Sequence, residues 1–157
     1  MSDDVMARIV AAVELGRSGE PAAARHALQT LWDEIGGNDG DAFHRCVLAH
    51  FMADLQDDAQ AELRWDELAL QAAAAVTDER AQEYDASLQV RGLMPSLYLS
   101  LADDHRRLGE MQRAQEFLDQ ARSVRDVLGD DPYGTMIKSA MENIDRALAE
   151  GSSERLS

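Results

Sequence analysis

Apolar residues recur every three to four positions along most of the chain, which is the spacing of side chains on one face of an α-helix. Strictly alternating runs of β-branched and aromatic residues, which favour strands, are absent. The pattern therefore predicts an all-α protein. The predicted helices cover residues 3–17, 20–35, 41–55, 58–75, 95–108, 111–128 and 132–149. Segment 77–94 is ambiguous, and a short helix from Thr77 followed by a loop is one interpretation.

The prolines and glycines fall in the gaps between these segments. Pro21, Pro95 and Pro132 each stand where a helix can begin, because the N–H that proline lacks would be unpaired at a first helical position. Gly109 and Gly129 mark two of the expected turns. The positions of these prolines and glycines divide the chain into helices. The helices follow one another as pairs joined by short connections.

One helix pair carries a specific residue pattern. It reads Tyr98-x-x-Leu101-Ala102-x-x-His105, then Gly109, then Ala114-x-x-x-Leu118-x-x-Ala121. This unit resembles the tetratricopeptide repeat, in which an aromatic residue, a Leu-Gly pair and a tyrosine precede a turn glycine and an Ala-x-x-x-Phe-x-x-Ala stretch. His105 departs from the pattern, since it stands in place of the tyrosine. Small residues at these positions let two helices approach closely.

The same unit reads more weakly twice upstream, where Ala24 and Ala61 take the place of Ala114. The first spacing, 37 residues, is close to the repeat length of about 34 residues. The second spacing is 53 residues, which indicates an insertion of roughly twenty residues that falls on segment 77–94.

The resemblance implies antiparallel helix pairs stacked as a short right-handed superhelix, with about three pairs and a C-terminal capping helix. We expect one domain over residues 1–150 and a frayed tail over 151–157, which has no apolar periodicity. Proteins of this family bind protein or peptide segments in a groove lined by the first helix of each pair. Carried onto this chain, the groove candidates are Ile9, Val13, Arg17, Phe43, Cys46, His50, Asp54, Leu99, Asp103, Arg106 and Arg107.

A different kind of site is also conceivable on the predicted helix 41–55. Cys46, His50 and Asp54 are spaced four residues apart, so they share one helix face, and all three residue types bind transition metals. However, three ligands along one straight helix seldom converge on one ion, and His50 lies at a poor angle to activate a thiol. We therefore predict no catalytic residue, metal or cofactor, and keep a metal- or thiol-dependent enzyme as the alternative function. A structural domain that self-associates, for example as a homodimer, is another.

The net charge of the chain favours some classes of binding partner over others. The chain has 30 acidic and 15 basic side chains and a net charge of −15. Such a surface repels nucleic acids and anionic membranes, because binding to either relies on lysine and arginine. A basic protein or peptide suits it better.

The cysteine content, the N-terminus and the lack of long apolar runs indicate the cellular compartment of the protein. A single cysteine excludes an intrachain disulfide, the acidic N-terminus lacks the basic start of a secretory signal, and no apolar run approaches about 20 residues. We expect a cytoplasmic protein. The strong preference for arginine over lysine, together with the many alanines, suggests a GC-rich, bacterial genome.

Overall fold

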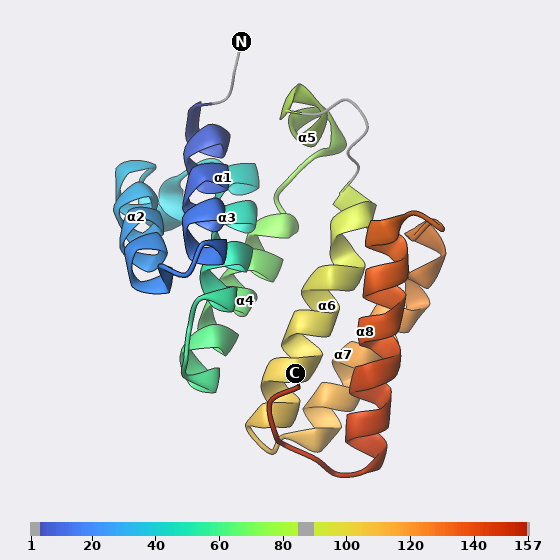
Figure 1. The fold of residues 1–157 in the computed structure, drawn as a ribbon. Helices are drawn as coiled ribbons and strands as arrows, with labels where there is room; N and C mark the ends of the chain where they lie inside the picture. The colour runs from blue at the N-terminus through green and yellow to red at the C-terminus, as the bar shows by residue number, and fades with distance from the viewer. Residues whose placement is uncertain (1–3, 85–89, 157) are drawn as a thin grey trace. The chain divides into compact units, whose positions relative to one another are not determined.

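A computed structural model describes residues 4–84 and 90–156, and within these ranges the chain forms eight α-helices and no strand (Figure 1). The predicted all-α class and its packed helix pairs are confirmed. The helices are α1 (Asp4–Arg17), α2 (Pro21–Glu34), α3 (Ala42–Asp54), α4 (Ala59–Ala73), α5 (Asp78–Tyr84), α6 (Val90–Arg107), α7 (Met111–Ser123) and α8 (Pro132–Ala149), with 3-10 turns η1 (Gly37–Asp39) and η2 (Arg125–Val127).

The chain divides into two compact units, Met1–Leu88 and Gln89–Ser157, and each unit is described by itself. The single domain expected over residues 1–150 stays a prediction. In the first unit α1 packs on α2 and α3 packs on α4, and α3 also contacts both helices of the first pair (Figure 1). The fully buried side chains of this unit include Ile9, Ala24, Leu28, Leu48, Ala49, Ala69 and Ala72.

Two tryptophans join α2 to α4 in the same unit. The rings of Trp32 and Trp65 meet edge to face, with centroids 5.2 Å apart and an interplanar angle of 85°. This is a favoured aromatic geometry because the positive edge of one ring faces the negative face of the other. The sequence predicts both tryptophans as packing residues, and Trp32 is buried as expected.

In the second unit α6 packs on α7, and α8 contacts both of these helices (Figure 1). Ala102, Ala114 and Ala121 are fully buried, which lets α6 and α7 approach closely, and Tyr98 stacks on Phe117 with ring centroids 6.4 Å apart. His105, in the position of the repeat tyrosine, also stacks on Phe117. The small residues of the repeat-like pattern therefore do lie in a close helix contact.

Helix α8 begins as the sequence indicates, with Pro132 in its first turn and the Asp131 side chain accepting a hydrogen bond from Gly134 N–H at 2.9 Å. It buries one stripe of apolar side chains, Ile137, Met141, Ile144 and Ala147. In contrast, Tyr133 and Met136 at the start of the helix stay 45% and 58% exposed.

The predicted start of α6 is wrong. The helix begins at Val90, five residues before Pro95, so this proline lies inside it. Proline removes the hydrogen bond that an N–H at position 95 would donate to the carbonyl of Arg91 and brings its ring close to that carbonyl, but the proline side chain is buried. Burial thus outweighs the rule that places proline at a helix start.

Two other boundaries also differ from expectation. The helix predicted over 111–128 ends at Ser123 and is followed by η2. The short helix expected from Thr77 is present as α5, and Thr77 Oγ1 accepts from Arg80 N–H at 3.1 Å. The loop expected after it is wrong for residues 90–94, which are helical, while residues 85–89 lie outside the described part of the chain.

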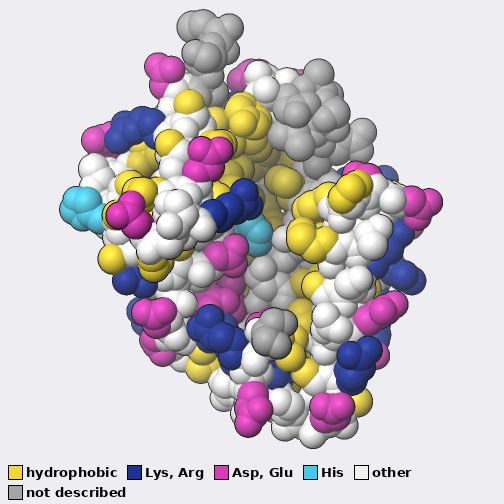
Figure 2. All heavy atoms as spheres, viewed as in Figure 1, with side chains coloured by type: hydrophobic (Ala, Val, Ile, Leu, Met, Phe, Trp, Pro, Cys, Tyr) yellow, Lys and Arg dark blue, Asp and Glu magenta, His cyan; other side chains and the backbone are white. Residues whose placement is uncertain are grey.

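Acidic side chains lie on the surface of each unit, interspersed with arginines, as the face drawn in Figure 2 shows. This agrees with the strongly negative net charge. None of the helices in the described ranges combines the length and the apolar character needed to cross a bilayer.

Candidate functional site

The groove candidates predicted from the sequence differ widely in exposure. The buried members are Ile9, Phe43, Cys46, Leu99 and Arg106. Val13, His50, Asp103 and Arg107 are half-buried, and Arg17 and Asp54 are exposed. The buried apolar members belong to the core, so the residues that can offer polar atoms to a ligand are the polar ones on α1, α3 and α6.

On α6 the structure brings two of the candidates together. The Arg106 guanidinium, which has no exposed surface, donates from Nε and Nη2 to Asp103 Oδ1 at 3.1 Å and 2.8 Å. The two residues are three positions apart on one helix face. The two-pronged contact holds the guanidinium plane in one orientation and leaves further N–H groups for other acceptors.

Those groups bind the main chain that follows α8. Arg106 Nη1 donates to the carbonyl oxygen of Ser152 at 2.7 Å, and Nη2 donates to the carbonyl oxygen of Glu154 at 2.8 Å. Gly151, with φ of +67°, ends α8 in a left-handed conformation that lets the chain turn. The segment from Ser152 to Glu154, which the sequence predicts to fray, is placed against a buried arginine.

The contact between Arg106 and this segment could not be found from the sequence. Arg106 and Ser152 are separated by 46 residues, and a main-chain carbonyl leaves no mark in a residue pattern. The glycine after α8 indicates where the helix stops, but it does not indicate where the chain goes next.

On α3 the thiol of Cys46 is poorly suited to chemistry. The side chain is buried, and this burial raises the pKa of Cys46 to about 12, although the charge of Arg45 opposes the rise. Because the thiolate is both the nucleophile and the metal ligand, a thiol held neutral at pH 7 serves neither role. The geometry thus disfavours the thiol-dependent alternative.

His50, one turn after Cys46, faces α4. Its Nδ1 lies 3.9 Å from Asp66 Oδ1, and Asp66 is only 2% exposed. Burial by itself would lower the pKa of His50, but the contact with Asp66 and the charge of Asp54 outweigh it, so the pKa of His50 is raised. Neither carboxylate oxygen of Asp66 has a hydrogen-bond partner among the described residues.

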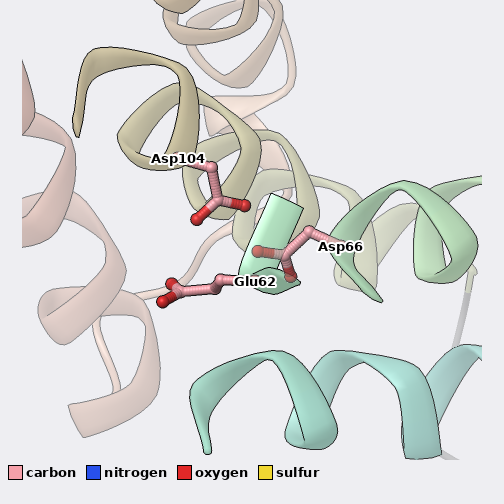
Figure 3. Close-up of side chains that lie close together, drawn as sticks. All are labelled: Glu62, Asp66 and Asp104. Atoms are coloured by element: carbon pink, nitrogen blue, oxygen red, sulfur yellow. The ribbon is translucent and has the colours of Figure 1, made fainter. Parts of the chain in front are cut away.

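A second carboxylate lies beside Asp66. Glu62 stands one turn earlier on α4, and Figure 3 shows the two side chains on this helix; one oxygen of each lies within 4.8 Å of the other. The third labelled residue in Figure 3, Asp104, belongs to α6 of the second unit. In the first unit Asp66 thus lies near both His50 and Glu62, and the charge of Asp54 also acts on His50, whereas Cys46 does not join them.

The residues of α4 were missed because their role depends on the partner helix. A Glu-x-x-x-Asp spacing at 62 and 66 is visible in the sequence, and so is His-x-x-x-Asp at 50 and 54. Only the packing of α3 on α4 shows that His50 and Asp66 face each other. A search for paired i, i+4 ligands on adjacent predicted helices would have found them.

Comparison of the chain with protein-family models, with curated proteins and with solved structures finds no match in any of the three.

Proposed function

We propose that this protein is a non-catalytic interaction module of the tetratricopeptide-like kind, which binds an extended segment of a protein or peptide. The observation that carries the proposal is the pair Asp103 and Arg106 on α6, whose guanidinium donates to the carbonyls of Ser152 and Glu154. Arg106, which is predicted to line a peptide groove and is held by Asp103, thus contacts a peptide segment that here belongs to the same chain.

The contact has the character of backbone recognition. Carbonyl oxygens two residues apart are common to every extended segment, whatever its side chains. A buried guanidinium fixed by a carboxylate offers its donors without losing much side-chain entropy on binding. The α6 surface is therefore suited to hold extended main chain, and the segment from Ser152 to Glu154 serves as a model for the ligand.

Charge supports a basic partner. The net charge of −15 attracts cationic segments over long range and speeds their encounter, while the contacts at Arg106 set the position of the backbone. The proposal includes a bacterial, cytoplasmic setting, which agrees with a single reduced cysteine.

The test uses the chain's own segment as the probe. A variant ending at Glu150, whose fold is checked by circular dichroism, is titrated with a fluorescent synthetic peptide of residues 150–157. We expect saturable binding, measured by anisotropy, and at least a tenfold loss of affinity when Arg106→Ala is added. Arg146→Ala, which removes an exposed arginine of α8, is the matched control and should bind as the parent does.

Two results would count against the proposal. One is a folded, truncated variant that does not bind the peptide at millimolar concentration. The other is equal binding by the Arg106→Ala and Arg146→Ala variants, which would show that the α6 surface does not hold the peptide.

A further inference from the structure

We propose that the chain inhibits its own α6 surface. Residues 152–154, which we call the strap, occupy the donors of Arg106, and a segment from another protein must displace the strap before it binds there. This inference rests on the proposed function, because it concerns the regulation of the same surface. It adds that the full chain is a closed form and that release of the strap opens it.

The hydrogen bonds at Arg106 are the first observation. Nη1 donates to the Ser152 carbonyl oxygen, and Nη2 donates both to the Glu154 carbonyl oxygen and to Asp103 Oδ1. Nε is also engaged, since it donates to Asp103 Oδ1. All three guanidinium nitrogens therefore already hold an acceptor within the second unit. An incoming carbonyl needs the same N–H groups, so the strap and an outside segment compete for them.

The anchor of the strap is the second observation. Gly151 N–H donates to the Leu148 carbonyl at 3.0 Å, and Ser152 N–H donates to the Ala147 carbonyl at 2.9 Å. With Gly151 at φ of +67°, these bonds form the Schellman turn that commonly ends a helix. Helix α8 itself packs on α6 (Figure 1), so the strap begins beside the surface that it covers. A tether this short gives an effective concentration on the order of millimolar or higher, against which a free ligand must compete.

The exposure of the strap is the third observation. Ser153 and Glu154 are exposed, Ser152 is half-buried, and Leu156 beyond the strap stays 40% exposed. The strap thus contributes no buried apolar side chain, and hydrophobic burial does not hold it. Hydrogen bonds to its main chain hold it instead, and every outside segment offers the same carbonyl groups. Exchange of the strap for such a segment therefore loses few contacts that the newcomer does not restore.

The experiment compares the full chain with the variant that ends at Glu150, each titrated with the fluorescent peptide of residues 150–157. We expect the full chain to bind the peptide at least about tenfold more weakly, because the apparent affinity falls with the fraction of molecules whose surface is open. Truncation removes one acidic and one basic side chain, Glu154 and Arg155, so the formal net charge stays the same. A difference in affinity therefore does not come from net charge.

A substitution in the full chain opens the surface without changing α6. Gly151→Val places a β-branched side chain at a left-handed position, where a Cβ meets no atom of the described residues within 4 Å, so backbone strain is its main effect. The strain should favour release of the strap and tighten peptide binding by roughly fivefold to thirtyfold, up to the affinity of the truncated variant.

Gly19→Val is the matched control. Gly19 has φ of +97° and similarly open space around its Cβ position, but it lies between α1 and α2 of the first unit. This variant should therefore bind the peptide as the parent does. Circular dichroism of each variant shows that it folds.

The inference is overturned, with the proposed function intact, if the full chain and the truncated variant bind the peptide equally tightly while Arg106→Ala still weakens binding. It is also overturned if Gly151→Val binds as weakly as the parent, or if Gly19→Val tightens binding as much as Gly151→Val does. If the truncated variant does not bind the peptide, the proposed function fails and this inference fails with it.

Discussion

Arg106 Nη1 donates a hydrogen bond to the Ser152 carbonyl oxygen at 2.7 Å, across 46 residues of chain. The guanidinium has no exposed surface, so its charge is compensated by Asp103 and by the main chain after α8. A buried charge that loses its partners is among the costliest changes in a protein. The segment after α8 is therefore part of the folded second unit.

Replacement of Arg106 by alanine should release this segment and destabilise the second unit by about 1.5–3 kcal/mol, the range for lost hydrogen bonds to a charged group, because Asp103 is 24% exposed and stays in contact with water. Urea unfolding followed by circular dichroism measures the loss, and hydrogen exchange should show faster exchange after Gly151. Arg146→Ala, at an exposed position of α8, should cost less than about 0.5 kcal/mol. Equal stability of the two variants would contradict the assignment.

Replacing glycine by alanine should have opposite effects on stability at positions 134 and 92. A Cβ at position 134 would lie 2.1 Å from the Gly129 carbonyl oxygen and 2.9 Å from Asp131 Oδ1. Gly134→Ala should therefore displace the turn and its N-cap, at a cost of about 2–3 kcal/mol. Gly92→Ala meets no atom of the described residues within 4 Å and should stabilise α6 by about 0.5–1 kcal/mol.

Thermal unfolding of both variants beside the parent is the measurement. The midpoint should fall for Gly134→Ala and rise for Gly92→Ala. If Gly134→Ala unfolded at the temperature of the parent, the close approach of the Gly129 carbonyl to the start of α8 would be wrong.

The sequence predicts the elements of this fold better than it predicts their contacts. Helical periodicity and the caps at Asp131 and Thr77 depend on nearby residues, so they are readable directly. The start of α6 was misplaced because Pro95 is a local signal that burial overrides. Local rules place helices, and tertiary packing decides the exceptions.

The candidate site shows the same difference between contacts within one helix, which the sequence predicts, and contacts between separate segments, which it does not. Asp103 and Arg106 were named from the repeat-like pattern because they lie on one helix, and the structure does bring them together. Asp66 and the Ser152 carbonyl were not named, since each contact depends on how separate segments pack. The residue pattern of one helix does not show which residues of a neighbouring helix or segment will pack against it.

Asp41 has two roles at the start of α3 that substitution can separate. Its Oδ1 accepts from His44 N–H at 3.1 Å as an N-cap, and its Oδ2 accepts from Arg80 Nε of α5 at 2.9 Å. Partial burial alone would raise the pKa of Asp41, but these hydrogen bonds outweigh it, so the pKa is lowered. The carboxylate therefore stabilises the fold above its unfolded pKa, and this contribution is lost as pH falls through the lower folded value.

Asp41→Ala should cost about 1 kcal/mol through the cap and should also speed hydrogen exchange in α5. Asp41→Asn keeps a cap acceptor, so its main effect should be on α5 and on the acid limb of the stability profile. Asp58, which caps α4 through Ala61 N–H at 3.2 Å, is the matched position. If Asp58→Asn loosened α5 as much as Asp41→Asn does, the link through Arg80 would be refuted.

The buried thiol of Cys46 should make the folded protein less stable at alkaline pH. Burial raises its pKa from 9.0 to about 12, against the opposing charge of Arg45, so the folded protein keeps the thiol proton where the unfolded chain loses it. Above pH 9 the unfolded state thus binds fewer protons, and the free energy of unfolding should fall by about 1.4 kcal/mol per pH unit from this group. Below pH 9 both states hold the proton and the contribution is flat.

The measurement is urea unfolding of the parent and of Cys46→Ala from pH 7 to 10.5. Tyrosine and lysine titration affect both proteins, so the difference between their profiles isolates the thiol. The parent should lose stability relative to Cys46→Ala only above pH 9, and its native thiol should react slowly with iodoacetamide, because alkylation needs the thiolate. Parallel profiles, or rapid alkylation of the folded protein at pH 8, would mean that Cys46 is accessible and ionises normally.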